Sequence, residues 1–320
     1  IIIINKFIGL EKKLQTAYIS HPDCLKHDMG IYHPECPQRL VAIENELKAS
    51  GLLSVLQCYD APFASIEQLA RAHTQSYIES VHQAAPRTGL IALDPDTTMN
   101  PFTLNAALRA AGAVVLATEL VLSGKVDNAF CAIRPPGHHA ESDRAMGFCV
   151  FNNIAVGVAH AIHAYQLQRV AILDFDVHHG NGSEEIFRDN PHVMLCSTFQ
   201  HPFYPYCGAD SGNPRMINVP LQRGSDGTVF RKAVTNDWLP ALDTFKPEMI
   251  FVSAGFDAHK DDDMAQLQFC DDDYVWITEQ IKALANQHAG GRIVSALEGG
   301  YELKSLGRCA TAHIKALNTN

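Results

Sequence analysis

The feature that most constrains the fold is a set of four short apolar runs, each followed by glycines and reactive polar side chains. One run, Val170–Leu173, leads into the stretch Asp174-Phe175-Asp176-Val177-His178-His179-Gly180-Asn181-Gly182. The others span 249–254, 292–297 and 129–133. Short apolar runs bounded by turn residues are typical of strands buried in a parallel sheet. Because open α/β sheets bind ligands at the carboxyl ends of their strands, the residues after these runs are predicted to share one crevice.

The stretch after the first run carries a candidate metal site. In an extended segment alternate residues share a face, so Asp174, Asp176 and His178 are predicted to point to one side. Two carboxylates and an imidazole at a buried strand end are costly to desolvate unless something cationic binds them. A divalent metal supplies that charge, and a structural ion-pair network around a helix N-terminus is the alternative.

Reactive residues follow the other three runs as well. Asp257 comes after the second run, next to Gly255, which admits a close backbone approach. Tyr301 follows the third run through a double glycine, and His138 and His139 follow the fourth. Any one of these residues suits an ordinary loop, turn or helix cap. Together, at one edge of a sheet, they favour the metal site.

The motifs, in this order, closely resemble the zinc-dependent histone deacetylase family. The match begins near residue 21 and continues to the C-terminus, and the segment 33–40 is similar to the family's N-terminal signature. Gly-His-His without an intervening Trp, together with Asn181, resembles class II enzymes and bacterial histone deacetylase-like amidohydrolases. The motifs that carry the resemblance are Arg134-Pro-Pro-Gly-His-His-Ala140, Gly147-Phe-Cys-Val-Phe-Asn-Asn153, Asp174-Phe-Asp-Val-His-His-Gly-Asn-Gly182, Ser253-Ala-Gly-Phe-Asp257 and Leu297-Glu-Gly-Gly-Tyr301.

The resemblance implies an arginase/deacetylase-like α/β fold with three αβα layers and a central, mostly parallel sheet of about eight strands. The chain has 320 residues, 47% of them hydrophobic, and no linker-like or repetitive segment divides it. We therefore expect a single domain over residues 16–320. The run Ile1–Ile4 makes residues 1–15 suspect as a non-native or disordered leader.

Helix signals lie between the predicted strands. Residues 37–50 have apolar positions at helical spacing and end at Gly51. A second helix is predicted up to residue 122, with Asn100 as its N-cap and Pro101 at its first position. A third is predicted for Asp271–His288, which begins with three acidic residues.

Composition excludes several classes of protein. A net charge of −10 argues against nucleic-acid binding and suits cationic substrates. Nine cysteines without a Cys-x-x-Cys pair indicate reduced thiols in the cytoplasm. No uninterrupted apolar run reaches the roughly 18 residues of a membrane span, so no membrane association is expected.

Competing chemistries fit the residues less well. A dinucleotide-binding loop at Gly180 and Gly182 would need a third glycine where Glu185 stands. No Gly-x-Ser-x-Gly elbow of a serine hydrolase occurs. Ureohydrolases with a manganese pair resemble the same fold, but they need further aspartates around the metal strand.

The resemblance also implies the catalytic roles. It makes Asp176, His178 and Asp257 ligands of zinc, with ferrous iron as an alternative metal in vivo. It makes His139 the general base and acid, and His138 its electrostatic, water-orienting partner. The remaining roles implied are orientation of His138 by Asp174, orientation of His139 by Asn181, and an oxyanion contact from the hydroxyl of Tyr301.

A substrate tunnel and potassium sites are implied in the same way. Gly147, Phe148 and Tyr204 resemble the tunnel lining, although the position of Tyr204 is commonly Phe in the family. Arg39 matches an arginine of an internal channel that attracts acetate, and an exposed surface arginine is the alternative. Asp174 and Ser197 would hold structural potassium; an outer potassium site would use backbone oxygens near Phe187, Asn190 and Val193.

The predicted function is hydrolysis of the acetyl amide of Nε-acetyl-lysine in proteins or peptides, with release of acetate. Met264 stands where polyamine-specific members carry an acidic gatekeeper, which favours acetyl-lysine over an acetylated polyamine. Asp94, Asp96 and the run 261–263 keep acidic contacts, and hence an acetylpolyamine amidohydrolase, open as the alternative. A catalytically inactive acyl-lysine-binding protein is a further alternative, although no ligand, base or tyrosine is missing. A homo-oligomer is compatible with the sequence.

Overall fold

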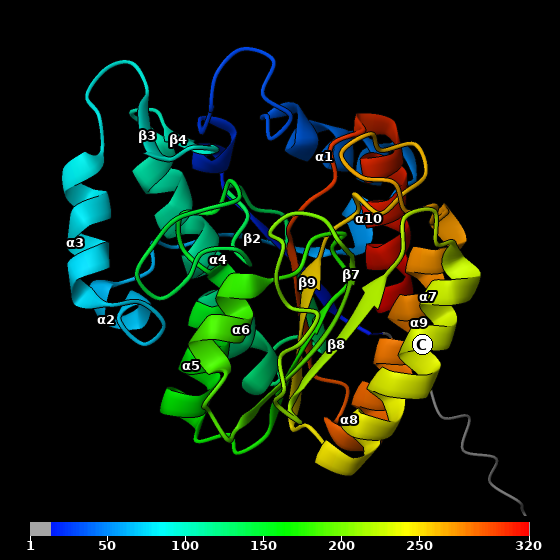
Figure 1. Ribbon diagram of the computed structural model, residues 1–320. Coiled ribbons are helices and arrows are strands. Elements are labelled where there is room, and N and C mark those ends of the chain that lie inside the picture. Colours follow the sequence, from blue (N-terminus) through cyan, green and yellow to red (C-terminus); the bar gives the residue numbers. More distant parts are fainter. Residues whose placement is uncertain (1–13, 320) are drawn as a thin grey trace, which may run out of the picture.

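Eight parallel strands form one sheet through the centre of the molecule (Figure 1). The computed structural model describes residues 14–319, so most of the predicted leader, residues 1–13, lies outside the described residues. The strand order is β2-β1-β5-β10-β9-β6-β7-β8, which confirms the predicted sheet. The strands are β1 (Thr16–Ser20), β2 (Gln57–Asp60), β5 (Asn128–Cys131), β6 (Val170–Asp174), β7 (Val193–Gln200), β8 (Met216–Leu221), β9 (Met249–Ala254) and β10 (Ile293–Leu297).

The four strands expected from the apolar runs are neighbours in the middle of this sheet. They lie in the order β5-β10-β9-β6, and their paired positions are aligned, for example Val294 with Phe251 and Phe251 with Ile172. Their carboxyl ends therefore meet at one edge. A short antiparallel hairpin, β3 (Ile91–Asp94) with β4 (Thr97–Met99), lies outside the sheet.

Helices cover both faces of the sheet and bury it in two apolar layers. α4 and α5 pack on one face, and α1, α9 and α10 on the other (Figure 1). Side chains alternate between the layers along each strand: Ile172 faces the first, and Leu173 the second. The helices are α1 (Gln38–Ala49), α2 (Ile66–Leu69), α3 (Gln75–Ala84), α4 (Thr103–Leu122), α5 (Asn153–Tyr165), α6 (Asn181–Phe187), α7 (Gly227–Ala233), α8 (Leu239–Phe245), α9 (Asp271–His288) and α10 (Leu303–Leu317), with short 3₁₀ turns η1 (Pro22–Leu25) and η2 (Leu52–Val55) and a π turn η3 (Val234–Trp238).

Two of the three predicted helices are confirmed, as α1 and α9, while the start of the other was wrong. α4 begins at Thr103, so Asn100 is not its N-cap. The hydroxyl of Thr103 instead donates to Asn100 Oδ1 and accepts from the Asn100 N–H, both at 2.9 Å. These reciprocal bonds close a turn before the helix, and Pro101 lies within that turn.

Helix α4 is long and apolar enough to cross a membrane, with a mean hydropathy of 1.4 over its best window. In this structure 67% of that window is buried, because the helix lies against the sheet and α5. Its small side chains let neighbouring backbone approach closely: the Ala64 N–H donates to the carbonyl of Leu108 at 2.9 Å.

All nine cysteines are free, as expected for reduced thiols. Five of them, among them Cys131 and Cys196 in the central strands, are buried. They act as small core side chains.

Gly112→Ala is expected to lower the free energy of unfolding by about 1–3 kcal/mol, although alanine is normally the better helix former. The added methyl would overlap the Pro62 carbonyl oxygen and lie 2.8 Å from the Ala64 nitrogen. Urea unfolding measures the change. Asn105→Ala, at an exposed position of the same helix, is the control and is expected to be neutral or slightly stabilising. Equal stability of Gly112→Ala and the native protein would contradict the close approach.

Candidate active site

Asp176, His178 and Asp257 converge just beyond the ends of β6 and β9. His178 Nδ1 lies 3.0 Å from Asp176 Oδ1 and 3.3 Å from Asp257 Oδ2. All three residues are buried, and one ligand atom from each lies within 4.8 Å of the others. The structure thus brings together the three predicted metal ligands.

The donor set fits a divalent metal. The inner carboxylate oxygens are already used by backbone groups: the N–H of His178 donates to Asp176 Oδ1, and the N–H of Val177 donates to Asp257 Oδ1. Asp257 Oδ2 is buried without a hydrogen-bond partner. Two carboxylates and one imidazole nitrogen are the oxygen and nitrogen ligands that catalytic zinc accepts, with further positions open.

Two glycines beside the metal-ligand cluster leave the space that its carboxylates occupy. A Cβ atom on Gly299 would lie 2.6 Å from Asp176 Oδ2 and would overlap Asp257 Oδ2. A Cβ atom on Gly255 would overlap Asp176. The Gly299 N–H donates to Asp176 Oδ2 at 2.8 Å, so the turn before Tyr301 is bonded directly to a candidate ligand.

The pKa values of His178 and Asp257 show that the carboxylate pair of Asp176 and Asp257 strongly favours a positive charge beside it. Burial and the neighbouring Asp176 raise the pKa of Asp257 to about 6. Burial by itself lowers the pKa of His178, but its close contacts with the carboxylates of Asp176 and Asp257 raise it to about 10. A bound divalent cation meets the same demand as this proton.

The predicted histidine pair lies beside the cluster, and each ring is oriented by the expected partner. His138 Nδ1 is 2.9 Å from Asp174 Oδ2, and His139 Nδ1 is 2.8 Å from Asn181 Oδ1. The two ring centroids are 4.0 Å apart.

The two histidines differ in basicity. Burial lowers the pKa of His138, but Asp174 and Asp176 more than offset it and raise the value to about 10. Burial and the positive charges of His138 and His178 hold the pKa of His139 well below its usual range. His139 is therefore the neutral member of the pair.

Glu298, for which no role was predicted from the sequence, binds the backbone of the segment 134–139, which carries His138 and His139 and is called the histidine loop. Its Oε2 accepts the N–H groups of Gly137 at 2.6 Å and His138 at 3.1 Å. Burial raises the pKa of Glu298 to about 7. Its place in Leu297-Glu-Gly-Gly-Tyr301 was the available signal, but the contact joins segments 160 residues apart.

Arg39 is fully buried, so the alternative of a surface arginine is wrong. Its guanidinium lies 4.8 Å from the ring centroid of Tyr301. It donates to the carbonyl oxygens of Gly300 at 2.6 Å and Glu298 at 2.5 Å, and to Glu35 Oε1 at 3.1 Å. Arg39 thus holds the turn that carries Tyr301 from its buried side.

The same Glu35 carboxylate also binds Arg134, which opens the histidine loop. Arg134 Nη2 lies 2.6 Å from Glu35 Oε2, and Arg134 Nε donates to Oε1. His27 Nε2 is 3.2 Å from Oε2 on the remaining side. All of these side chains are buried, and sequence reasoning missed Glu35, Arg134 and His27 as a unit.

A cavity of about 240 Å³ opens onto the cluster. The ring of Phe148 meets Tyr301 edge-on at 6.0 Å, and Tyr204 meets His139 at 5.3 Å, so aromatic walls lead to the predicted catalytic residues. Phe203, which was not predicted, stacks on His178 at 5.6 Å. The lining residues are Asp96, His139, Gly147, Phe148, His178, Phe203, Tyr204, Met264 and Tyr301.

Only part of the predicted acidic rim faces this cavity. Asp96 lines it. Asp262, one of the acidic residues left open as a substrate contact, turns inward and accepts the N–H groups of Tyr301 at 2.6 Å and Glu302 at 3.0 Å. Its backbone-binding position, like that of Glu298, steadies the Tyr301 turn.

The predicted potassium ligands are neighbours across two strands. Asp174 pairs with Ser197 in the register of β6 and β7, and Ser197 Oγ is buried without a hydrogen-bond partner. An orphaned buried hydroxyl beside a carboxylate fits a cation. The outer potassium site stays a prediction.

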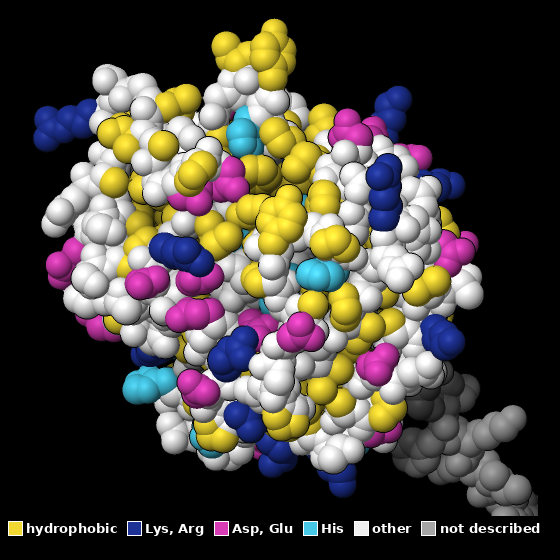
Figure 2. All heavy atoms as spheres, in the orientation of Figure 1, with side chains coloured by type: hydrophobic (Ala, Val, Ile, Leu, Met, Phe, Trp, Pro, Cys, Tyr) yellow, Lys and Arg dark blue, Asp and Glu magenta, His cyan; other side chains and the backbone are white. Residues whose placement is uncertain are grey.

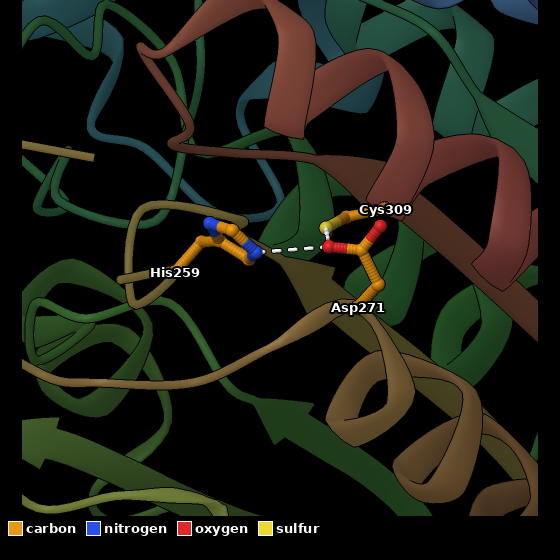
Figure 3. A group of neighbouring side chains, drawn as sticks. All are labelled: His259, Asp271 and Cys309. Carbon is orange, nitrogen blue, oxygen red and sulfur yellow. Dashed lines mark hydrogen bonds and ion pairs between the residues drawn. The ribbon is translucent and has the colours of Figure 1, made fainter. Parts of the chain in front are cut away.

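A second group of ligand-type side chains, His259, Asp271 and Cys309, lies between the loop after β9 and helices α9 and α10 (Figure 3). His259 Nε2 is 2.9 Å from Asp271 Oδ1, while its Nδ1 accepts the Asp261 N–H at 3.1 Å, so Nε2 carries the ring proton. Arg308 already pairs with Asp271 at 2.8 Å. The ring proton of His259 and the guanidinium of Arg308 therefore already bind the Asp271 carboxylate, where a metal would have to bind.

Comparison with known proteins shows the family of the chain. A model of the histone deacetylase domain matches residues 33–317. The chain belongs to the histone deacetylase family. Named members are deacetylases and amidohydrolases, so the chain is a hydrolase of this family.

Relatives within the histone deacetylase family carry different substrate names. The chain is 38% identical to "Histone deacetylase-like amidohydrolase" of Pseudomonas aeruginosa, over 89% of this chain and 77% of that protein. It is 37% identical to "Polyamine deacetylase HDAC10" of Mus musculus, over 94% of this chain but 48% of that protein, and it spans still less of some other relatives. The crystal structure of the HDA15 HD domain superposes with a TM-score of 0.89 at 32% identity, covering 95% of this chain and 88% of that one.

Asp176→Ala, His178→Ala and Asp257→Ala are each expected to abolish hydrolysis and to lower bound zinc, because two remaining ligands hold the metal poorly. Metal analysis of the purified variants measures this. Asp271→Ala, in the second cluster, is the control and should keep the zinc content of the native protein. Full zinc in all three variants, or equal loss in the control, would contradict the site.

Proposed function

We propose that this protein is a zinc-dependent deacetylase that hydrolyses the acetyl amide of Nε-acetyl-lysine in proteins or peptides and releases acetate. The observation that carries the proposal is the cavity itself, whose aromatic walls lead to Asp176, His178 and Asp257 with His139 and Tyr301 beside them. Aromatic faces suit the aliphatic stem of an acyl-lysine, and the depth of the site suits its neutral amide. Bound by the three ligands, zinc would polarise the amide carbonyl and the attacking water.

His139 acts as the general base and then as the general acid. Its Nδ1 is engaged by Asn181, which leaves Nε2 as the ring nitrogen that takes a proton from water and returns it to the leaving amine. His139 lines the cavity, so substrate can reach it. A base must be neutral to act, and the lowered pKa of His139 keeps it so.

His138 and its partner act electrostatically. Asp174 fixes the ring through Nδ1 and favours its protonated form, so that the imidazole holds water in place rather than removing its proton. Asn181 is neutral where an aspartate would make the facing histidine more basic. The two orienting residues therefore assign the two histidines opposite roles.

Tyr301 donates its hydroxyl to the oxyanion that develops on the amide carbonyl. Arg39 lies over the ring and binds the carbonyl oxygens of Glu298 and Gly300 in the turn before it, and Asp262 accepts the N–H of Tyr301. The phenol is therefore positioned before substrate arrives. Burial raises the pKa of this hydroxyl well above its usual value, so it remains a donor.

Met264 favours acetyl-lysine over an acetylated polyamine, because it puts a neutral side chain on the cavity lining where a second ammonium would need a carboxylate. The alternative, an acetylpolyamine amidohydrolase, is favoured by Asp96 on the same lining and by the name of the mouse relative. Rates measured side by side on acetyl-lysine peptides and acetylated polyamines decide between them. No hydrolysis of either would favour an inactive acyl-lysine-binding protein.

We further propose structural potassium at Asp174 and Ser197, with ferrous iron as the alternative catalytic metal. The free cysteines support a reducing, cytoplasmic location. No nucleic acid or membrane takes part in the proposed reaction.

Tyr301→Phe is expected to lower kcat on the order of 100-fold or more with zinc content unchanged, because only the hydroxyl is removed. Tyr204→Phe removes a hydroxyl from the cavity wall and is the matched control. It should leave kcat within about a few-fold, since Phe is common at this position in the family. An unchanged kcat for Tyr301→Phe would show that Tyr301 does not contact the oxyanion.

Met264→Glu is expected to raise kcat/KM for acetylspermidine severalfold relative to an acetyl-lysine peptide. A partly exposed carboxylate–ammonium pair contributes up to about 1 kcal/mol. Met264→Gln, of similar size but neutral, is the control and should leave the ratio unchanged. If the native enzyme already prefers acetylpolyamines, Asp94 or Asp96 supplies the carboxylate and the ranking of substrates is reversed.

A further inference from the structure

The large hydrophobic side chains most exposed to solvent lie in or beside two turns that contact the walls of the cavity. Tyr32 is 100% exposed, Ile31 87%, Tyr206 74% and Leu90 51%; every other large hydrophobic residue in the described part of the chain is less exposed. We name these four residues the mouth collar. In Figure 2 hydrophobic side chains are concentrated over the upper part of the visible face.

One half of the mouth collar is attached to the wall formed by Phe148. The ring of His33, next to Tyr32 in the chain, meets the Phe148 ring edge-on at 4.7 Å. The turn is closed by the His33 N–H, which donates to the carbonyl of Gly30 at 3.2 Å. A Cβ on Gly30 would lie 3.4 Å from Leu90 Cδ1, so Leu90 flanks the same turn.

The other half is attached to the opposite wall. The Tyr206 N–H donates to the carbonyl of Phe203 at 2.7 Å. Phe203 and Tyr204 line the cavity, so the ring of Tyr206 projects from the turn that forms this wall. The mouth collar therefore carries apolar surface on both sides of the opening.

Both tyrosines of the mouth collar adopt a backbone conformation that disfavours them. Tyr32 has a φ of 68° and Tyr206 a φ of 63°, in the left-handed region where glycine or asparagine is preferred. Phe148, on the cavity wall, has a φ of 68° as well. Neither the backbone strain nor the exposure of these rings stabilises the fold. Residues held in such conformations are common at ligand-binding sites.

We propose that the mouth collar binds the polypeptide on both sides of the acyl-lysine, and that it selects substrates with bulky apolar side chains next to that lysine. This inference rests on the proposed function, since it extends the same cavity outward. Aromatic and aliphatic side chains that are exposed around an opening bury apolar area when a chain lies across them.

A polyamine fits this surface less well. Its ammonium groups gain little from an apolar surface, and one oxygen of each carboxylate of the nearby hairpin already accepts a backbone hydrogen bond. Asp96 Oδ1 accepts the N–H of Gly147 at 2.9 Å, and Asp94 Oδ1 accepts the N–H of Asp96 at 2.9 Å. Ile31 and Leu90 offer an ammonium no partner.

The test uses the double variant Tyr32→Gly/Tyr206→Gly and two peptides with one acetyl-lysine each. One peptide has Phe and Leu next to the lysine, and the other has Gly on both sides. Because glycine tolerates a positive φ, the double variant should fold with a melting temperature equal to or above that of the native protein. Lys246→Gly is the matched control: Lys246 has a φ of 54°, and it follows α8 at the lower end of the molecule (Figure 1).

The native enzyme should prefer the apolar peptide by on the order of 10-fold in kcat/KM, and the double variant should lose that preference. Rates on capped acetyl-lysine, which is too short to reach the mouth collar, should stay within about twofold for every variant. Equal native rates on the two peptides would overturn the inference, as would a matching loss on capped acetyl-lysine. A selective loss on acetylspermidine would show that the rings bind ammonium groups instead.

Two further measurements keep the inference separate from the proposed function. If the native enzyme hydrolyses none of these compounds, the proposed function fails. Fluorescence anisotropy with the same two peptides then tests the mouth collar alone, and equal affinities overturn it. If sedimentation shows a native dimer that the double variant loses, the mouth collar is a contact between copies of this chain and the inference is wrong.

Discussion

Compensation of buried charge is the constraint on which this structure depends. The carboxylates of Glu35, Asp174, Asp176, Asp257 and Glu298 are all withdrawn from water near the carboxyl ends of the central strands. Two buried guanidiniums, Arg39 and Arg134, offset part of this charge. The excess of negative charge is concentrated around Asp176 and Asp257, which is where a protonated histidine or a divalent cation is needed. The same electrostatic imbalance that destabilises the site as a bare cluster makes it a candidate metal site.

The same need for charge compensation explains why the side chains that support the predicted catalytic residues are polar. Glu35 binds Arg134 on one side and Arg39 on the other, and these two arginines hold the histidine loop and the Tyr301 turn. Glu298 joins the same two loops by accepting backbone N–H groups of one while its own carbonyl binds Arg39 from the other. An apolar core could not fix backbone donors and acceptors in this way, because each would be left without a partner.

The side chains that cluster in the candidate site were predicted from the sequence better than those that support them. Asp176, His178 and Asp257 follow apolar runs directly, and strand register brings such residues together by itself. The position of Arg39 and the role of Glu35 depend on contacts with segments about residues 134 and 298, far along the chain, and residue type alone made a surface arginine equally reasonable. The inward position of Asp262 could not be predicted for the same reason, since an acidic run usually faces solvent. The predicted N-cap of α4 was wrong for a local reason. The hydroxyl of Thr103 binds the side chain and N–H of Asn100 and closes a turn before the helix, which the pattern Asn-Pro does not reveal.

The backbone hydrogen bonds to Asp262, Glu298 and Arg39 have a thermodynamic consequence. They fix the Tyr301 turn and the histidine loop in the free protein, so that little conformational entropy remains to be lost when substrate enters. The heat-capacity change of substrate binding should then reflect the apolar area covered in the cavity and little coupled folding. An inhibitor that reaches only these residues would meet a rigid receptor, and its affinity would depend on the fit of its own shape.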